Sequence, residues 1–319
     1  MSAFKERLKK KYGMEDRKAF LFCYVMVGIA FFFFCFFWVN VNLSSIALAF
    51  RDSETGKFTL ENFKEVWKAF TDVDMFGWNL GKALGRTMRL WFYVNVLCVL
   101  PSMLSTYILY KKMPGHYVFR VIFMIPTILN GIVWVMIMKN MVSLNGPIVT
   151  LLSKMGVNFS AEVQLKGLLG STDTAFLTVA LIAIMPHLVG FNMIISGAYA
   201  RIPTELYEVG RLEGVGFIRE FFVVSVPLVW STVVVCMIGN MATIFTFDGN
   251  VFLYTMGNYE TGTMGFYLYY ITFKISGSGL SKNDYGYPAA IGVTMTLMTM
   301  PVVLFGKYVL ERAIEPVEF

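Results

Sequence analysis

The chain has 319 residues, of which 56% are apolar and only 15% are charged, and its mean hydropathy is +0.61. Soluble globular domains are about half apolar and about a quarter charged, so this composition excludes an ordinary soluble domain. The net charge of +6 requires no nucleic-acid partner, because membrane proteins collect basic residues on their cytoplasmic side. The composition therefore predicts a multi-pass protein of the plasma membrane, embedded in the lipid bilayer.

Six windows of the sequence contain no Asp, Glu, Lys or Arg. Each is about as long as a helix that crosses the ~30 Å hydrocarbon core of a bilayer. The windows are residues 19–50, 90–110, 121–138, 174–200, 221–247 and 285–306. Because lipid offers no hydrogen-bond partner to peptide groups, such windows form helices. The predicted fold class is an all-α membrane protein with six transmembrane helices.

Basic residues near the window ends predict the orientation, since Lys and Arg are retained on the cytoplasmic side. Seven of them crowd residues 1–18, which we expect to form a basic cytoplasmic N-terminus, with residues 19–319 as one transmembrane domain. Six crossings then return the C-terminus to the cytoplasm, although the first outer loop also holds basic residues. A cleaved signal peptide is a weaker alternative, because its apolar core spans only ~7 to 15 residues.

Two segments on the expected outer side are too short to cross the membrane. Apolar residues recur at helical spacing over 58–70, which predicts a surface helix. The uncharged stretch 261–273 predicts a re-entrant or interfacial helix. Its tyrosines at 267, 269 and 270 are expected to anchor the membrane interface, with direct contact to a solute as the alternative.

The segment 201–227, between the fourth and fifth windows, is charged and punctuated by glycine. Pro203 fits a helix start, and Gly214 interrupts the run before 216–222 resumes it. The pattern predicts a helix, a turn and a second helix on the cytoplasmic side.

The charges of this segment lie mostly on its first helix. Glu205 and Glu208 fall in the first two turns, where carboxylates suit the positive end of the helix dipole. Glu208 and Arg211 are three residues apart, so they are expected to pair. From these charges alone, a solvated inner loop with an internal ion pair is the favoured interpretation.

Polar residues are rare inside the windows, and four residues there are candidates for a solute pathway. Asn240, Thr243 and Phe247 follow one another at helical spacing, so we expect them to share one face of the fifth helix. His187 lies midway along the fourth helix. Hydrogen-bonding groups beside an aromatic wall suit a hydroxylated ligand. The alternative is that these groups only hydrogen-bond between helices.

The spacing of the 201–227 segment resembles the EAA loop of ABC importer permeases. The motif runs Glu-Ala-Ala, three residues, Gly, nine residues, then Ile-x-Leu-Pro, and it fits at Glu208, Gly214, Val224, Val226 and Pro227. Val209 and Gly210 replace the two alanines. Further stretches resemble the same family, namely residues 58–63, Pro126, Trp134, 145–146, 247–255 and 286–290. The chain is thus similar to the MalF-like permease subunits of carbohydrate importers, although 257–259 departs from their usual Gly-Gly-Pro.

This resemblance implies a MetI-like permease fold with both termini inside and a coupling helix in the 201–227 loop. It also implies import of a neutral sugar or oligosaccharide, a second MalG-like permease, two ABC ATPase subunits and an extracytoplasmic solute-binding protein. The expected ATPase-coupling residues are Glu205, Glu208, Arg211, Glu213 and Gly214. No nucleotide-binding loop of the form G-x-x-x-x-G-K-[ST] occurs, so the partner ATPases are expected to bind ATP and Mg. We expect no catalytic residue, metal site or cofactor in this chain.

Other functions explain the sequence less well. An ABC importer for a non-sugar solute is the nearest alternative. An ion-coupled transporter normally carries buried charges in its helices, and the six windows contain none. A membrane enzyme needs a cluster of catalytic groups, and the spacing of the two histidines and four cysteines indicates none.

Overall fold

The computed structural model describes residues 17–52, 55–72, 77, 79–277 and 285–313. Most of the predicted basic N-terminus therefore lies outside the described residues. The regular elements are α2 (Arg17–Phe33), η1 (Phe34–Val39), α3 (Asn40–Ala49), α4 (Glu61–Ala69), α5 (Leu80–Trp91), η2 (Phe92–Val96), α6 (Val99–Tyr110), α7 (His116–Ile128), α8 (Gly131–Met141), α9 (Pro147–Lys154), α10 (Ala161–Lys166), η3 (Leu168–Gly170), α11 (Thr172–Tyr199), α12 (Thr204–Leu212), α13 (Phe217–Glu220), η4 (Phe221–Ser225), α14 (Val226–Met241), α15 (Val251–Thr255), α16 (Met264–Gly277) and α17 (Gly286–Ala313). The predicted all-helical fold class is confirmed.

Five continuous helical stretches of the described chain are long and apolar enough to cross a membrane: Phe20–Ala49, Leu80–Tyr110, Thr172–Tyr199, Phe217–Met241 and Gly286–Ala313. They correspond to five of the six predicted windows. The second starts ten residues earlier than its window, because the amphipathic helix α5 continues directly into it. Arg86, which the sequence placed in an outer loop, is thereby buried on this helix with only 4% of its surface exposed.

The third predicted window does not form one straight helix. It is divided between α7 and α8, whose axes differ by 104°. Asn130 lies at the break, where its side chain accepts a hydrogen bond of 2.9 Å from the backbone N–H of Ile132 and caps α8. Pro126, near the end of α7, has no backbone N–H to extend the helix. The six-span count therefore depends on whether this bent pair counts as one span.

The fifth predicted helix ends six residues before its expected end. Its last helical residue is Met241, and residues 242–246 form turns. The carbonyl of Asn240 accepts hydrogen bonds from Trp91 Nε1 at 2.9 Å and from Thr243 Oγ1 at 2.8 Å. Side-chain bonds of this kind replace the next helical backbone bond. The sequence predicted that Thr243 and Phe247 share a helical face with Asn240. They do not, because both lie beyond the end of α14.

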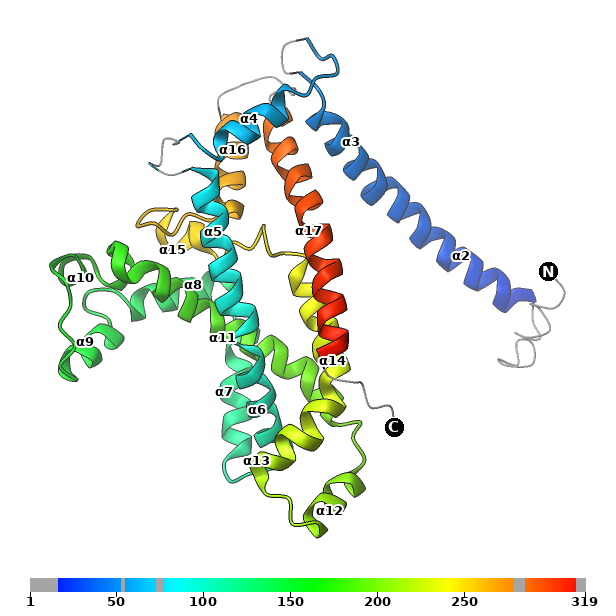
Figure 1. Ribbon diagram of the computed structural model, residues 1–319, viewed down its shortest axis with the longest axis vertical. Helices are drawn as coiled ribbons and strands as arrows, with labels where there is room; N and C mark the ends of the chain where they lie inside the picture. The colour runs from blue at the N-terminus through cyan, green and yellow to red at the C-terminus, as the bar shows by residue number, and fades with distance from the viewer. Residues whose placement is uncertain (1–16, 53–54, 73–76, 78, 278–284, 314–319) are drawn as a thin grey trace.

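The two ends of the molecule carry different short helices (Figure 1). The predicted surface helix is α4, which packs against α17 at one end. The predicted re-entrant helix is α16, which packs against α5 and α17. Tyr267 on α16 is only 4% exposed and its hydroxyl lies 3.2 Å from that of Tyr287, so the prediction that it anchors the membrane interface is wrong.

The opposite end of the molecule carries α12 and α13, beside the end of α6 (Figure 1). The 28-residue helix α11 packs against α6, α7 and α14. By contrast, α2, η1 and α3 extend away from the bundle as one long helix, with α3 reaching α17 (Figure 1). This arrangement places the 201–227 segment at one end and leaves the predicted solute residues near the middle.

Candidate functional site

The 201–227 segment forms the predicted helix, turn and second helix. After α12, the N–H of Val215 donates a 3.0 Å hydrogen bond to the carbonyl of Gly210, which closes the turn. Gly214 lies in this turn with a φ of +75°, and a Cβ there would meet nothing within 4 Å. The backbone conformation, and not packing, therefore favours glycine here. A residue with a Cβ adopts this left-handed conformation at a cost of ~1–2 kcal/mol.

The outward surface of this segment mixes acidic and apolar side chains. Glu205, Glu208 and Glu213 are exposed. Leu212 is 88% exposed and Ile218 is 71% exposed, so apolar side chains lie beside these carboxylates at the surface. The side chain of Arg211 lies outside the described part of the structure, so its predicted pairing with Glu208 stays a prediction. The outward surface of this segment therefore carries exposed carboxylates and exposed aliphatic side chains together.

Tyr207 packs the inward surface of α12 against the rest of the molecule. This residue is 5% exposed, and its hydroxyl lies 3.3 Å from Ser225 Oγ. Lys111 Nζ lies 3.9 Å from the centre of the Tyr207 ring, a cation–π contact. Burial raises the pKa of the Tyr207 phenol to about 12, so the ring stays neutral under the ammonium group. The contact joins α12 to the end of α6.

A buried carboxylate, that of Glu220, also contacts Lys111. We call Tyr207, Lys111 and Glu220 together the anchor of the α12–α13 unit. Glu220, at the end of α13, is 4% exposed and forms an ion pair with Lys111. Tyr107 Oη donates a 2.9 Å hydrogen bond to Glu220 Oε1. Losing one partner of a buried ion pair typically costs ~3–5 kcal/mol, since the other charge stays buried without compensation. No local pattern in the sequence predicts this pair, because Lys111 and Glu220 are far apart along the chain.

His187 lies between two cavities near the middle of the molecule. Its ring packs edge-on against Phe247, with ring centres 5.4 Å apart. The first cavity has a volume of about 270 Å³ and is lined by Trp134, Ala183, Pro186, His187, Phe247, Asp248, Gly249, Asn250 and Tyr254. The second has a volume of about 320 Å³ and is lined by Pro186, His187, Gly190, Phe191, Ile194, Cys236 and Asn240. We call them the solute cavities.

Three of the four predicted solute residues line these cavities. His187 borders both, Phe247 the first and Asn240 the second. Thr243 lines neither, and its hydroxyl donates to the carbonyl of Asn240. The sequence thus selected three residues that line neighbouring cavities, although through a helical face that the structure does not form, and their contact with a solute stays a prediction.

Trp134 and Asp248 were not predicted as site residues. Trp134 is 8% exposed, and within the described part of the chain its Nε1 has no hydrogen-bond partner. Asp248 accepts a 2.9 Å hydrogen bond from Thr263 Oγ1. Burial raises the pKa of the Asp248 carboxyl, while bonds from Thr263 and from the backbone N–H groups of Asn250 and Val251 oppose this shift. Aromatic rings beside a free indole N–H and a carboxylate suit a hydroxylated ligand.

Comparison with known structures defines the class of fold. The chain matches a bacterial alginate ABC transporter, solved in complex with an alginate pentasaccharide-bound periplasmic protein, with a TM-score of 0.74. The match covers 98% of this chain and 100% of that chain at 16% identity. The fold is therefore that of an ABC transporter permease.

Comparison with curated proteins narrows this class. The chain is 25% identical over 186 residues to the probable ABC transporter permease protein YurN of Bacillus subtilis, covering 58% of this chain and 61% of that protein. It is 26% identical over 222 residues to the maltose/maltodextrin permease MalF of Photorhabdus laumondii, covering 65% of this chain and 40% of that protein. The chain thus spans about half the length of these relatives, and no model of a protein family matches it. It resembles carbohydrate ABC permeases, as the sequence analysis predicted.

Proposed function

We propose that this chain is the transmembrane permease subunit of an ABC importer that moves a neutral sugar or oligosaccharide into the cell. The observation that carries the proposal is the α12–α13 unit, whose outward surface is acidic and apolar and whose inward surface is anchored to α6. The similarity to permeases named for sugar transport supports it. The solute cavities between α8, α11 and the residues after α14 support the choice of a hydroxylated solute.

In this proposal the α12–α13 unit binds one of two partner ATPase subunits, which bind and hydrolyse ATP with Mg. Glu205, Glu208, Arg211 and Glu213 provide the polar contacts, and Gly214 sets the turn that presents them. A second, MalG-like permease completes the pathway, and an extracytoplasmic binding protein delivers the solute.

The buried anchor gives this unit a way to act on the membrane helices. Movement of α12 is passed through Tyr207 and Lys111 to α6, and through Glu220 to η4 and α14. The end of α14 borders the second cavity at Asn240. A rigid-body displacement at the ATPase contact would thus reach the solute cavities, in the manner of other domain movements that switch between two states.

A neutral solute fits the charges at the cavities. Asp248 is the one charged side chain among the described residues that line them. A carboxylate there repels acidic sugars and accepts hydrogen bonds from sugar hydroxyls. The alginate transporter of similar fold handles an acidic polysaccharide, but an identity of 16% supports similarity of fold alone.

An ion-coupled transporter is the second candidate, and Asp248 is the observation that favours it. A half-buried carboxyl beside a cavity, with a raised pKa, is a feature of proton-coupled transport. The two functions differ in their energy source. Uptake by the wild-type protein in vesicles that have a proton gradient but no ATP would favour the second candidate.

The coupling role is tested with Glu208→Lys, which reverses an exposed charge on α12. We expect it to abolish uptake of labelled sugar by cells that express the complete transporter, while the amount of protein in the membrane stays unchanged. Glu162→Lys is the matched control, because Glu162 is also exposed and lies on α10, away from α12. Uptake at the wild-type rate in the Glu208 variant would show that α12 does not couple transport to ATP hydrolysis.

A further inference from the structure

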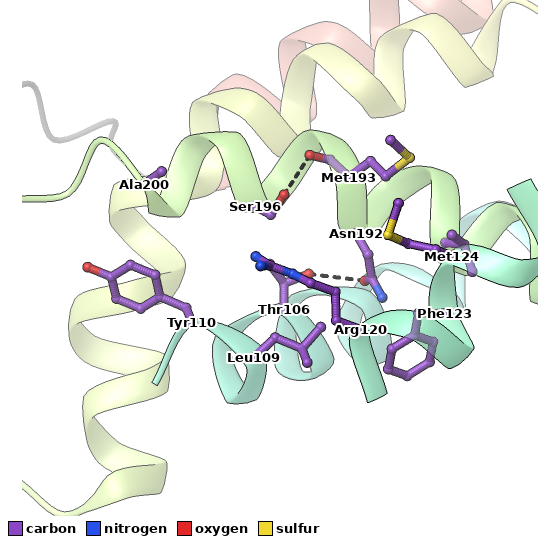
Figure 2. Close-up of a pocket in the computed structure, with 11 residues that line it drawn as sticks. Thr106, Leu109, Tyr110, Arg120, Phe123, Met124, Asn192, Met193, Ser196 and Ala200 are labelled. Carbon is purple, nitrogen blue, oxygen red and sulfur yellow. Dashed lines mark hydrogen bonds between the residues drawn. The ribbon is translucent and has the colours of Figure 1, made fainter. Parts of the chain in front are cut away.

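The largest of the three cavities described here lies between α6, α7 and α11 and has a volume of about 460 Å³ (Figure 2). We call it the inner cavity. Its polar lining residues are Thr106, Tyr110, Arg120, Asn192 and Ser196, and the remainder are Leu109, Phe123, Met124, Val189, Met193 and Ala200. Among these described lining residues none is acidic, and Arg120 is the basic one. The cavity therefore combines one cation with walls that are largely apolar.

The inner cavity is separate from the solute cavities. Both contact α11, but His187 lines the solute cavities and Ser196 lines the inner cavity. Nine residues separate these two positions, or two and a half turns of an α-helix, so they lie on opposite faces of α11. A solute that moves past His187 does not pass through the inner cavity.

The inner cavity lies at the end of the molecule that the sequence predicts to be cytoplasmic. Tyr110 and Ala200 line it, and each directly precedes a basic residue, Lys111 and Arg201. Basic residues next to helix ends lie at the level of the cytoplasmic headgroups. The guanidinium group of Arg120 reaches from α7 toward α6 and α11 at this level (Figure 2).

Two of the polar groups are already used to hold the helices together. Thr106 Oγ1 donates to the carbonyl of Ser102 at 2.7 Å and lies 3.0 Å from the side-chain amide of Asn192. This contact joins α6 to α11 (Figure 2). Arg120 is exposed and presents several N–H donors to the cavity. An anion is the ligand that this donor set fits, because arginine binds phosphate oxygens through two parallel hydrogen bonds.

We propose that the inner cavity binds an anionic phospholipid of the cytoplasmic leaflet, with the phosphate group on Arg120 and part of an acyl chain against Phe123, Met124 and Met193. Basic pockets between membrane helices on the cytoplasmic side are known to bind lipid phosphate groups. The site touches α6, and Lys111, which contacts Tyr207 of α12, directly follows the end of α6. The proposal needs the predicted orientation of the chain but not its proposed function in sugar import.

The test measures lipid binding to the purified full-length chain by native mass spectrometry. Phosphatidylglycerol is the anionic probe, and phosphatidylcholine, with no net charge, is the comparison. We expect the wild-type chain to retain phosphatidylglycerol in preference to phosphatidylcholine. Arg120→Gln is expected to weaken phosphatidylglycerol binding about fivefold, the factor that corresponds to the ~1 kcal/mol contributed by one basic residue near an anionic headgroup.

Two further variants separate the cavity from general charge. Arg312→Gln removes an exposed arginine from the end of α17, outside the cavity, and is expected to leave binding unchanged. Ser196→Trp fills the cavity without a change in charge and is expected to weaken binding while Arg120 remains. Both positions are exposed, so neither substitution disturbs a packed core.

Several results would overturn the proposal. One is equal retention of both lipids by the wild-type chain, which would show that the inner cavity does not select anionic lipid. Contact with a partner protein would then be the alternative role of the cavity. Another is an Arg120 variant that binds phosphatidylglycerol as tightly as the wild type. A third is displacement of phosphatidylglycerol by millimolar inorganic phosphate, which would identify a site for free phosphate.

Discussion

The buried pair between Lys111 and Glu220 predicts a large loss of stability when it is broken from one side. The two side chains are 13% and 6% exposed, so little solvent is available to either charge. Lys111→Met leaves the Glu220 carboxylate buried with Tyr107 as its remaining described partner, and this typically costs ~3 kcal/mol or more. Glu220→Gln keeps a hydrogen-bond acceptor for Tyr107 but leaves the Lys111 ammonium group without its counter-ion at 13% exposure, so it is also expected to cost ~3 kcal/mol or more.

The double variant tests whether these costs come from one interaction. Removing both charges leaves no uncompensated ion, so we expect the combined loss to be smaller than the sum of the two by ~1–3 kcal/mol. The measurement is the free energy of unfolding of the purified protein, by denaturant titration followed through tryptophan fluorescence. Costs that add within ~0.5 kcal/mol would refute the inference that the two residues interact.

An exposed ion pair in the same chain provides the control. Lys307 and Glu311 lie on α17 at a distance of 3.8 Å, and each is about half exposed. Water already stabilises these charges, so exposed pairs contribute little to stability. Lys307→Met should therefore have a far smaller effect than Lys111→Met. Similar effects at both sites would show that loss of a lysine in general, and not the buried pair, lowers the stability.

Two further predictions concern the turn after α12 and the first solute cavity. Gly214→Val should lower uptake and destabilise the turn by ~1–2 kcal/mol, because a φ of +75° disfavours side chains; Gly210→Ala is the control, since it lies within α12 and should be neutral or stabilising by up to ~1 kcal/mol. Uptake assays and thermal melting check both, and a Gly214 variant with normal uptake and stability would contradict the role of the turn. Trp134→Phe breaks no hydrogen bond within the described chain, so its cost in stability comes only from the packing lost with the smaller ring, but it should raise the sugar concentration needed for half-maximal uptake. An unchanged uptake curve would remove Trp134 from the solute site.

Local features of the sequence were sufficient to predict most of the elements. Uncharged windows located five membrane-crossing helices, since burial of apolar groups and satisfaction of peptide hydrogen bonds in lipid depend mainly on composition. Pro203 and Gly214 located the start of α12 and its turn, because each restricts the backbone within a few residues. The same local information selected His187, Asn240 and Phe247 near the solute cavities.

Contacts between distant segments decided the remainder. Trp91 and Thr243 bind the carbonyl of Asn240 where α14 ends, and no pattern within the fifth window indicates that an indole from α5 is present there. The ion pair of Lys111 with Glu220 likewise exists only because α6 packs against η4, which directly follows α13. Such contacts depend on which helices become neighbours, so the amino-acid sequence of one segment specifies its helix but not the site that several helices form together.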